Sequence, residues 1–422
     1  MDNKAPLAFL ALTAVLAFSG LGLYGLASAV GPETPAIPDA ALLISSDIHY
    51  ISPALTDHGA YFEDMIQNSD GKVMDYIEEL TDTLLAEVLD RQPAALILSG
   101  DLTFNGARQS HTELAQKLEA VVDAGVPVLV IPGNHDLENR NAASFHGPDF
   151  TRVDSVTPED FARIYARCGY EGALSRDTAS LSYVYEPEAG LRILMLDVNT
   201  PDYVNLAQAE TLAWIESQLR DAQSAGARVV AVSHQNVLQH NSLIVSGYLI
   251  ENAHDLLRLY DKYGVICNLS GHLHCQHIAR SDTGFYDIAT SSLAVSPNQY
   301  GILTLSANAA RYDTVAADVA GWAAAQGRTD PALLDFAAYS RDFFRRSGRD
   351  ASPEDYADLP DGDALAAFIA DVNEAYFAGR MDTIDFDDPR FDRLLTEGGF
   401  MGAYLSSTRA DGPVDMNHLV LY

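Results

Sequence analysis

The chain has 422 residues, of which 48% are hydrophobic, and its formal net charge is −33 at pH 7. This length suffices for two domains with sizeable cores, and the hydrophobic content excludes global disorder. A charge this negative argues against a nucleic-acid polymer as partner, because phosphate backbones require clustered Lys and Arg. The three cysteines, Cys168, Cys267 and Cys275, are too few and odd in number for a disulfide framework.

The first segment is an uncharged apolar run from Leu7 to Val30, preceded by Lys4. Its length fits a membrane-spanning helix, which needs about 20 apolar residues, whereas Ala27-Ser28-Ala29 has the small residues of a signal-peptide cleavage site. We predict that residues 1–38, which end in a proline-rich linker, are a signal peptide or an uncleaved membrane anchor; a buried core helix is the alternative. Lys4 predicts export of the remainder, to the cell envelope as an anchored or secreted protein.

From residue 40 onward, short apolar runs alternate with helical periodicity, which is typical of a layered α/β domain. Strands are predicted at 41–46, 96–99, 128–131, 191–196, 229–233, 265–270, 285–290 and 302–305. Helices are predicted at 73–89, from about 109, at 158–167 (where Thr157 and Asp160 can form a capping pair), at 206–222 and at 254–263. The rest of 137–180 is predicted to be irregular.

The carboxyl-terminal part differs, because residues 323–422 lack strand patterns and hold amphipathic helical stretches such as 331–346 and 364–378. We therefore predict two folded domains, an α/β domain at 39–318 and a separate helical domain at 319–422.

Five of the predicted strands end in metal-binding side chains. In open α/β sheets, ligands gather outside the carboxyl ends of the strands, so one feature of the fold would bring these side chains together. Two residues apart in an extended backbone, Asp47 and His49 point the same way, and His272 and His274 repeat that spacing. The full set supplies two carboxylates, one amide oxygen and four imidazoles: Asp47, His49, Asp101, Asn134, His234, His272 and His274.

Seven ligands suit two divalent ions better than one, with Asp101 as the bridging carboxylate. Two ions about 3.5–4 Å apart clamp the attacking and leaving oxygens of a displacement at phosphorus, and a water between them becomes the nucleophilic hydroxide. His135 is not needed as a ligand, so it can protonate the leaving oxygen as general acid. Asp136 is expected to orient His135 or raise its pKa. Asn105 is a candidate for positioning the substrate phosphate, with a turn before a helix as the alternative.

The motifs resemble those of the calcineurin-like metallophosphoesterase superfamily, in order: Asp47-Ile48-His49, Gly100-Asp101, Gly133-Asn134-His135-Asp136, His234 and Gly271-His272-Leu273-His274. The segments 100–106 and 291–297 are similar to those of exported bacterial members, which carry a helical carboxyl-terminal domain and are described as cyclic-nucleotide phosphodiesterase-like. The resemblance implies a four-layer α/β/β/α sandwich at 39–318 and the ligand roles given above.

The same resemblance implies a pair of divalent or trivalent ions, either Fe, Mn or Zn. Phe104 stands where purple acid phosphatases carry a tyrosine, so an iron-tyrosinate site is not expected. Asp136 stands where a glutamate is common among 5′-nucleotidases, which disfavours that branch.

The function predicted from these residues is metal-dependent hydrolysis of a small organic phosphate, with a phosphodiester such as a cyclic nucleotide favoured. Two alternatives remain open. One is a phosphomonoesterase or nucleotidase of the same superfamily, and the other is a non-catalytic envelope binding protein that retains the fold. If the amino-terminal segment is not cleaved, the membrane would be a further partner.

Overall fold

A computed structural model describes residues 40–67, 70–200, 204–350, 361–397 and 399–422. The predicted signal peptide or anchor lies outside the described residues, so export and anchoring stay predictions. Among the helices that are described, none combines the length and the apolar character that a bilayer crossing requires.

The first of two large sheets has the strand order β15-β14-β13-β1-β2-β3. Its parallel part pairs β1 with β2 and β2 with β3, whereas β13, β14 and β15 are added antiparallel. The strands are β1 (Ala40–Ser45), β2 (Ala95–Leu98), β3 (Val128–Val130), β13 (Gln299–Leu305), β14 (Ala310–Ala316) and β15 (His418–Leu421).

The second sheet has the order β11-β12-β10-β9-β8-β7-β6. Its central strands β12, β10, β9 and β8 run parallel, and β11, β7 and β6 are antiparallel to their neighbours. The strands are β6 (Ser175–Arg176), β7 (Tyr183–Glu188), β8 (Leu191–Leu196), β9 (Arg228–Ser233), β10 (Asn268–Ser270), β11 (His277–Arg280) and β12 (Tyr286–Ala289). A separate hairpin pairs β4 (Ala143–His146) with β5 (Asp149–Arg152).

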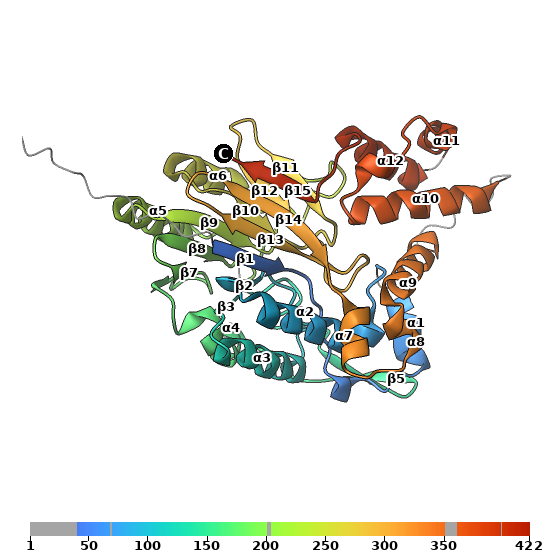
Figure 1. Cartoon of the computed structure of the whole chain (residues 1–422), viewed down its shortest axis with the longest axis horizontal. Coiled ribbons are helices and arrows are strands. Elements are labelled where there is room, and N and C mark those ends of the chain that lie inside the picture. Colours follow the sequence, from blue (N-terminus) through green and yellow to red (C-terminus); the bar gives the residue numbers. More distant parts are fainter. Residues whose placement is uncertain (1–39, 68–69, 201–203, 351–360, 398) are drawn as a thin grey trace, which may run out of the picture. The chain divides into compact units, whose positions relative to one another are not determined.

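Helices cover the outer faces of the two sheets (Figure 1). The helices α2 (Ile77–Arg91) and α3 (Arg108–Asp123) pack on the first sheet, whereas α5 (Ala209–Ala225) and α6 (Ala253–Tyr263) pack on the second. Strand β8 shows why, because Ile193 and Met195 enter the core between the sheets while Leu194 and Leu196 enter the core under α5 and α6. The order helix, sheet, sheet, helix confirms the predicted four-layer fold.

The predicted elements of this part are largely confirmed, but several elements of the structure were not predicted, among them the strands β7, β11 and β14. The helix α4 (Pro158–Ile164) begins with the predicted capping box, in which Thr157 and Asp160 each bond the other's backbone N–H. The prediction that 137–180 is otherwise irregular is wrong, since it contains the β4–β5 hairpin and β6. Helix α1 (Ala60–Gln67) was also not predicted.

The carboxyl-terminal part is helical, as expected, with one exception. Its helices are α7 (Val319–Ala325), α8 (Pro331–Leu334), α9 (Phe336–Asp350), α10 (Gly362–Phe377), α11 (Pro389–Glu397) and α12 (Gly399–Asp411). The prediction that no strand follows residue 323 is wrong, because β15 pairs with β14 at the edge of the first sheet. A domain boundary near residue 318 stays a prediction.

Two hydrophobic clusters join these helices to the α/β part. Val319, Phe336 and Phe343 share a cluster with Phe62 and Met74. In another cluster, Tyr376 of α10 lies with Leu273, the residue between His272 and His274. The helical part therefore packs directly behind one of the metal-binding motifs.

Candidate metal centre

The seven predicted ligands follow the carboxyl ends of five strands, as the sequence indicated. Three of these strands, β1, β2 and β3, belong to the first sheet, and two, β9 and β10, belong to the second. The site therefore forms where the ends of two stacked sheets meet, and not at the edge of a single sheet. One bond that joins the sheets runs from the backbone N–H of His272 to Asp47 Oδ2, at 2.9 Å.

Two groups of potential ligand atoms lie within 4.8 Å of one another, and Asp101 belongs to both. The first group is Asp47, His49, Asp101 and His274, and the second is Asp101, His234 and His272. Asp101 Oδ1 lies 3.4 Å from His234 Nε2, and Asp101 Oδ2 lies 4.0 Å from His49 Nε2. The amide oxygen of Asn134 joins the second group, since it lies 3.0 Å from His234 Nε2.

The backbone at five of the seven predicted ligands is left-handed and not extended. Positive φ angles occur at Asp47 (51°), His49 (53°), Asp101 (46°), His272 (68°) and His274 (58°). The prediction of an extended backbone for the pair Asp47 and His49 and for the pair His272 and His274 is therefore wrong. Asp47 and His49 nevertheless contribute to one group. Non-glycine residues in this conformation are uncommon and cluster at functional sites, where the surrounding structure holds them in place.

Hydrogen bonds outside the cluster orient the imidazole rings. His234 Nδ1 donates to the carbonyl oxygen of Ser99 at 2.9 Å, which leaves Nε2 facing Asp101. His272 Nε2 lies 3.2 Å from the carbonyl oxygen of Gly247, so its Nδ1 is the atom available to a cation. Such bonds fix the tautomer of a metal-binding histidine.

The electrostatics of the cluster favour charge on the shared carboxylate. Burial alone would raise the pKa of Asp101, but the nearby His234, His135 and His49 hold it well below its usual value. Burial alone would likewise lower the pKa of His234, but Asp101 and Asp47 raise it to about 9. Burial, followed by the charge of His234, lowers the pKa of His272 to about 3.

The donor set fits a pair of cations. Asp47 Oδ1 is buried and accepts no hydrogen bond from the described residues. His49 Nε2 and His274 Nε2 face each other at 3.1 Å, so two neutral imidazoles there would bring two lone pairs together unless one nitrogen carries a proton. A cation between these atoms would satisfy all three. The mixture of imidazole nitrogen and carboxylate oxygen suits several transition metals.

His135 stands beside this cluster, and Asp136 does not face it. His135 Nδ1 donates to the carbonyl oxygen of Phe104 at 2.8 Å, and Nε2 lies 3.8 Å from Asp101 Oδ2. The Asp136 carboxylate instead accepts from the backbone N–H groups of Leu102, Thr103 and Gly133. The expectation that Asp136 orients His135 is therefore corrected, because the carbonyl of Phe104 is the group that bonds the ring.

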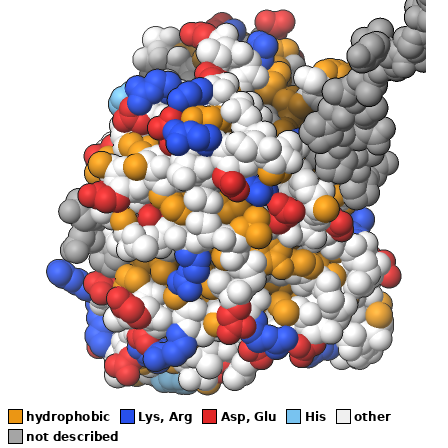
Figure 2. Space-filling view, turned by 90° about the vertical axis from the view of Figure 1, so that its left-hand side faces the viewer, with side chains coloured by type: hydrophobic (Ala, Val, Ile, Leu, Met, Phe, Trp, Pro, Cys, Tyr) orange, Lys and Arg blue, Asp and Glu red, His pale blue; other side chains and the backbone are white. Residues whose placement is uncertain are grey.

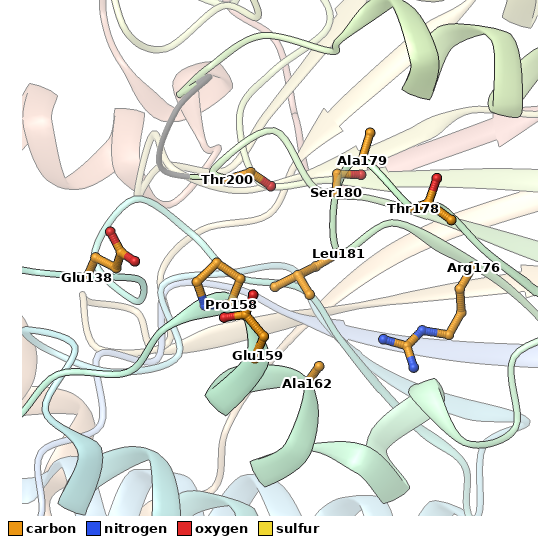
Figure 3. Close-up of a pocket in the computed structure, with 10 residues that line it drawn as sticks. All are labelled: Glu138, Pro158, Glu159, Ala162, Arg176, Thr178, Ala179, Ser180, Leu181 and Thr200. Atoms are coloured by element: carbon orange, nitrogen blue, oxygen red, sulfur yellow. The ribbon is translucent and has the colours of Figure 1, made fainter.

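Two cavities of the structure differ in their relation to the cluster. The cavity in Figure 3 has a volume of about 580 Å³, with Arg176 on one side and Glu138 on another. Its lining contains neither His135 nor any of the seven predicted ligands. A second cavity, of about 390 Å³, is lined in part by His135, Asn105 and Lys72. Lys72 is buried next to the site and was missed by sequence reasoning, because a single lysine carries no motif.

Residues 41–276, more than half of the chain, match the family described as Calcineurin-like phosphoesterase. The chain belongs to this family. Residues 318–415 of this phosphoesterase match a second family, described as the C-terminal domain of cyclic nucleotide phosphodiesterase. Both matches confirm the resemblance seen in the sequence. No curated protein matches the chain.

Solved structures to which the chain is similar include a dimetal phosphatase from Danio rerio, which is 13% identical with a TM-score of 0.49; the match covers 66% of this chain and 96% of that one. GAP50, the anchor in the inner membrane complex of Plasmodium, is 12% identical with a TM-score of 0.41, and the match covers 66% of this chain and 85% of that one. Vps29 with zinc from Entamoeba histolytica is 8% identical with a TM-score of 0.27, and the match covers 65% of this chain and 91% of that one.

Proposed function

We propose that this phosphoesterase uses two metal ions to hydrolyse a small organic phosphodiester, such as a cyclic nucleotide, with His135 as general acid. The observation that carries the proposal is the carboxylate of Asp101, which belongs to both groups of ligand atoms. A shared carboxylate suits the two-ion arrangement in which attacking and leaving oxygens are both stabilised. The match of residues 318–415 to the C-terminal domain of cyclic nucleotide phosphodiesterase supports a diester over a monoester.

The ligand roles follow from the two groups. One ion would be held by Asp47, His49, Asp101 and His274, and the other by Asp101, His234, His272 and the amide oxygen of Asn134. When bound, such ions would polarise the phosphate oxygens and lower the pKa of a water molecule. Fe, Mn and Zn all accept this mixture of nitrogen and oxygen ligands.

His135 has the contacts that a general acid needs. Its Nδ1–H bond to the carbonyl oxygen of Phe104 holds the ring with Nε2 toward Asp101. Its side chain is 37% exposed, so a substrate can reach Nε2, whereas Asp101 is 1% exposed. In the imidazolium form, Nε2 donates its proton to the leaving oxygen, and the neutral ring then regains a proton from solvent.

Removal of metal tests the proposal at the level of activity. Dialysis against a strong chelator should abolish turnover of a chromogenic bis-aryl phosphate, and Mn²⁺ should restore it. A panel of phosphomonoesters run in parallel separates a diesterase from a monoesterase. Full activity after chelation would rule out a metal-dependent reaction.

Substitution of His135 tests its separate role. His135→Ala should retain bound metal and slow catalysis by about 10²–10⁴-fold, most strongly for substrates with poor leaving groups. His254→Ala is the matched control, because this histidine is 77% exposed and belongs to neither ligand group. If His135→Ala lost metal to the same extent as a ligand variant, the assignment as general acid would be wrong.

A further inference from the structure

Aromatic side chains from several elements wall the cavity of about 390 Å³ that His135 helps to line. Tyr61 comes from α1, Phe145 from β4, Phe150 from β5 and Phe104 from the loop after β2. The rings of Tyr61 and Phe145 are nearly parallel, at 18° with centroids 6.4 Å apart, and Tyr61 and Phe150 are 6.2 Å apart. Rings arranged in this way offer faces on which a planar ligand can stack.

A buried acceptor in the same lining has no partner. Asn105 is 5% exposed, and its Nδ2 donates to the carbonyl oxygen of Ala143 at 3.1 Å. Its Oδ1 is buried and receives no hydrogen bond from any described residue. Since an unsatisfied buried acceptor is unfavourable, a ligand that brings an N–H or O–H donor to this oxygen would be selected.

The charges in the lining favour an anionic ligand. Lys72 and Arg152 line the cavity, and none of the described lining residues is acidic, in a chain whose net charge is −33. Lys72 Nζ lies 3.2 Å from Asp70 Oδ2, but the Lys72 side chain is 7% exposed while that of Asp70 is 69% exposed, so the cation is the buried partner. Figure 2 shows acidic and basic side chains interspersed over one face of the molecule.

The position of His135 relates the cavity to the reaction. A general acid must lie within hydrogen-bond reach of the leaving oxygen, so the organic group on that oxygen lies beside His135. The cavity is the space that His135 lines, and its volume falls within the range of about 300–1,000 Å³ usual for small-molecule sites. We propose that this cavity, with Phe150 and Asn105 as specificity-determining residues, holds a planar heteroaromatic ring with an N–H donor on the leaving group of the substrate, as in a nucleoside ester. This inference rests on the proposed function.

Binding of two phosphate ligands tests the inference without requiring turnover. Adenosine 5′-phosphate and ribose 5-phosphate share the phosphate and the sugar and differ in the base, so the ratio of their dissociation constants measures the contribution of the ring. Calorimetric titration of the full-length protein should give adenosine 5′-phosphate an advantage of about tenfold or more, since stacking of a base contributes on that scale.

Three variants locate the contact. Phe150→Ala, at a side chain that is 37% exposed, should remove most of the advantage, whereas Phe400→Ala, at a side chain that is 65% exposed on α12, should keep it. Asn105→Ala should weaken adenosine 5′-phosphate and leave ribose 5-phosphate unchanged. Equal affinities in the wild type, or a ratio that survives Phe150→Ala, would overturn the inference. Failure of the proposed function would look different: the protein would not hydrolyse diesters, but the ratio of the two dissociation constants would be unchanged.

Discussion

Replacement of Asp136 by asparagine separates a structural from a catalytic role for this carboxylate. Its Oδ2 accepts from the N–H groups of Leu102 (3.0 Å) and Gly133 (2.9 Å). Its Oδ1 accepts from the N–H (3.0 Å) and hydroxyl (2.9 Å) of Thr103. The carboxylate thus ties the loop that carries Asp101 to the loop that carries Asn134. Asparagine has the same shape but turns one of the two acceptors into a donor.

The expected loss of stability follows from those contacts. An amide NH₂ group leaves one or two buried N–H donors without an acceptor, at about 1–3 kcal/mol each, so the free energy of unfolding should fall by about 2–4 kcal/mol. This is a large part of the roughly 5–15 kcal/mol typical of a folded protein, but the variant should still fold.

Urea denaturation measures this loss, provided that the slope of unfolding free energy against urea concentration is unchanged. The kcat on a bis-aryl phosphate is then determined under conditions in which the variant is folded. We expect metal content and kcat to stay within a few-fold of the wild type. Unchanged stability together with a loss of kcat like that of His135→Ala would refute the structural role.

Two further predictions concern the shared carboxylate and its neighbour. Gly133→Ala should lower the free energy of unfolding by about 1–3 kcal/mol and abolish metal binding, because an added Cβ would lie 2.2 Å from Asp101 Oδ1 and 2.3 Å from the backbone N of Asp101. Gly125→Ala is the control: a Cβ there meets nothing within 4 Å, so this variant should lose stability but keep its metal. Metal retained in Gly133→Ala would contradict the account. In chelator-treated protein, His234 has a pKa of about 9 and therefore holds a proton that a metal ion must displace. The apparent metal affinity should rise about tenfold per pH unit from pH 6 to pH 8. An affinity that calorimetric titrations find to be independent of pH would be inconsistent with this. Because that pKa lies above the ordinary value of 6.5, the same proton stabilises the metal-free fold fully below pH 6.5, and urea denaturation should show this contribution lost as the pH rises toward 9.

The sequence predicted that these side chains lie together, because each of them follows a buried strand, and the structure brings six of the seven into two adjoining groups. The apolar runs of β1, β2, β3, β9 and β10 fix where strands end, and parallel strands bring their carboxyl ends to one side of the molecule. The four layers follow from the same alternation of strands and helices.

Other features depend on contacts that local patterns do not encode. The left-handed backbone at Asp47 is held by bonds with distant residues: its N–H donates to the carbonyl oxygen of Gly100, and its carbonyl oxygen accepts from the hydroxyl of Ser292. Strand β15 is short and lies at a sheet edge, so its pairing with β14 comes from tertiary structure. Asp136 is adjacent to His135 in sequence, but its carboxylate accepts a hydrogen bond from the buried backbone N–H of Leu102, which only the three-dimensional structure reveals. Lys72 and the aromatic wall come from separate segments without a common motif.

Metal content per chain tests the central claim most directly. Elemental analysis of purified protein should give about two ions per chain for the wild type and for His254→Ala. His272→Ala should retain about one ion, since His272 belongs to one group, whereas Asp101→Ala should lose both, since Asp101 belongs to both groups. Asp101→Ala protein that still holds two ions, or wild-type protein that binds none when incubated with Mn²⁺ or Zn²⁺, would contradict a shared dinuclear centre.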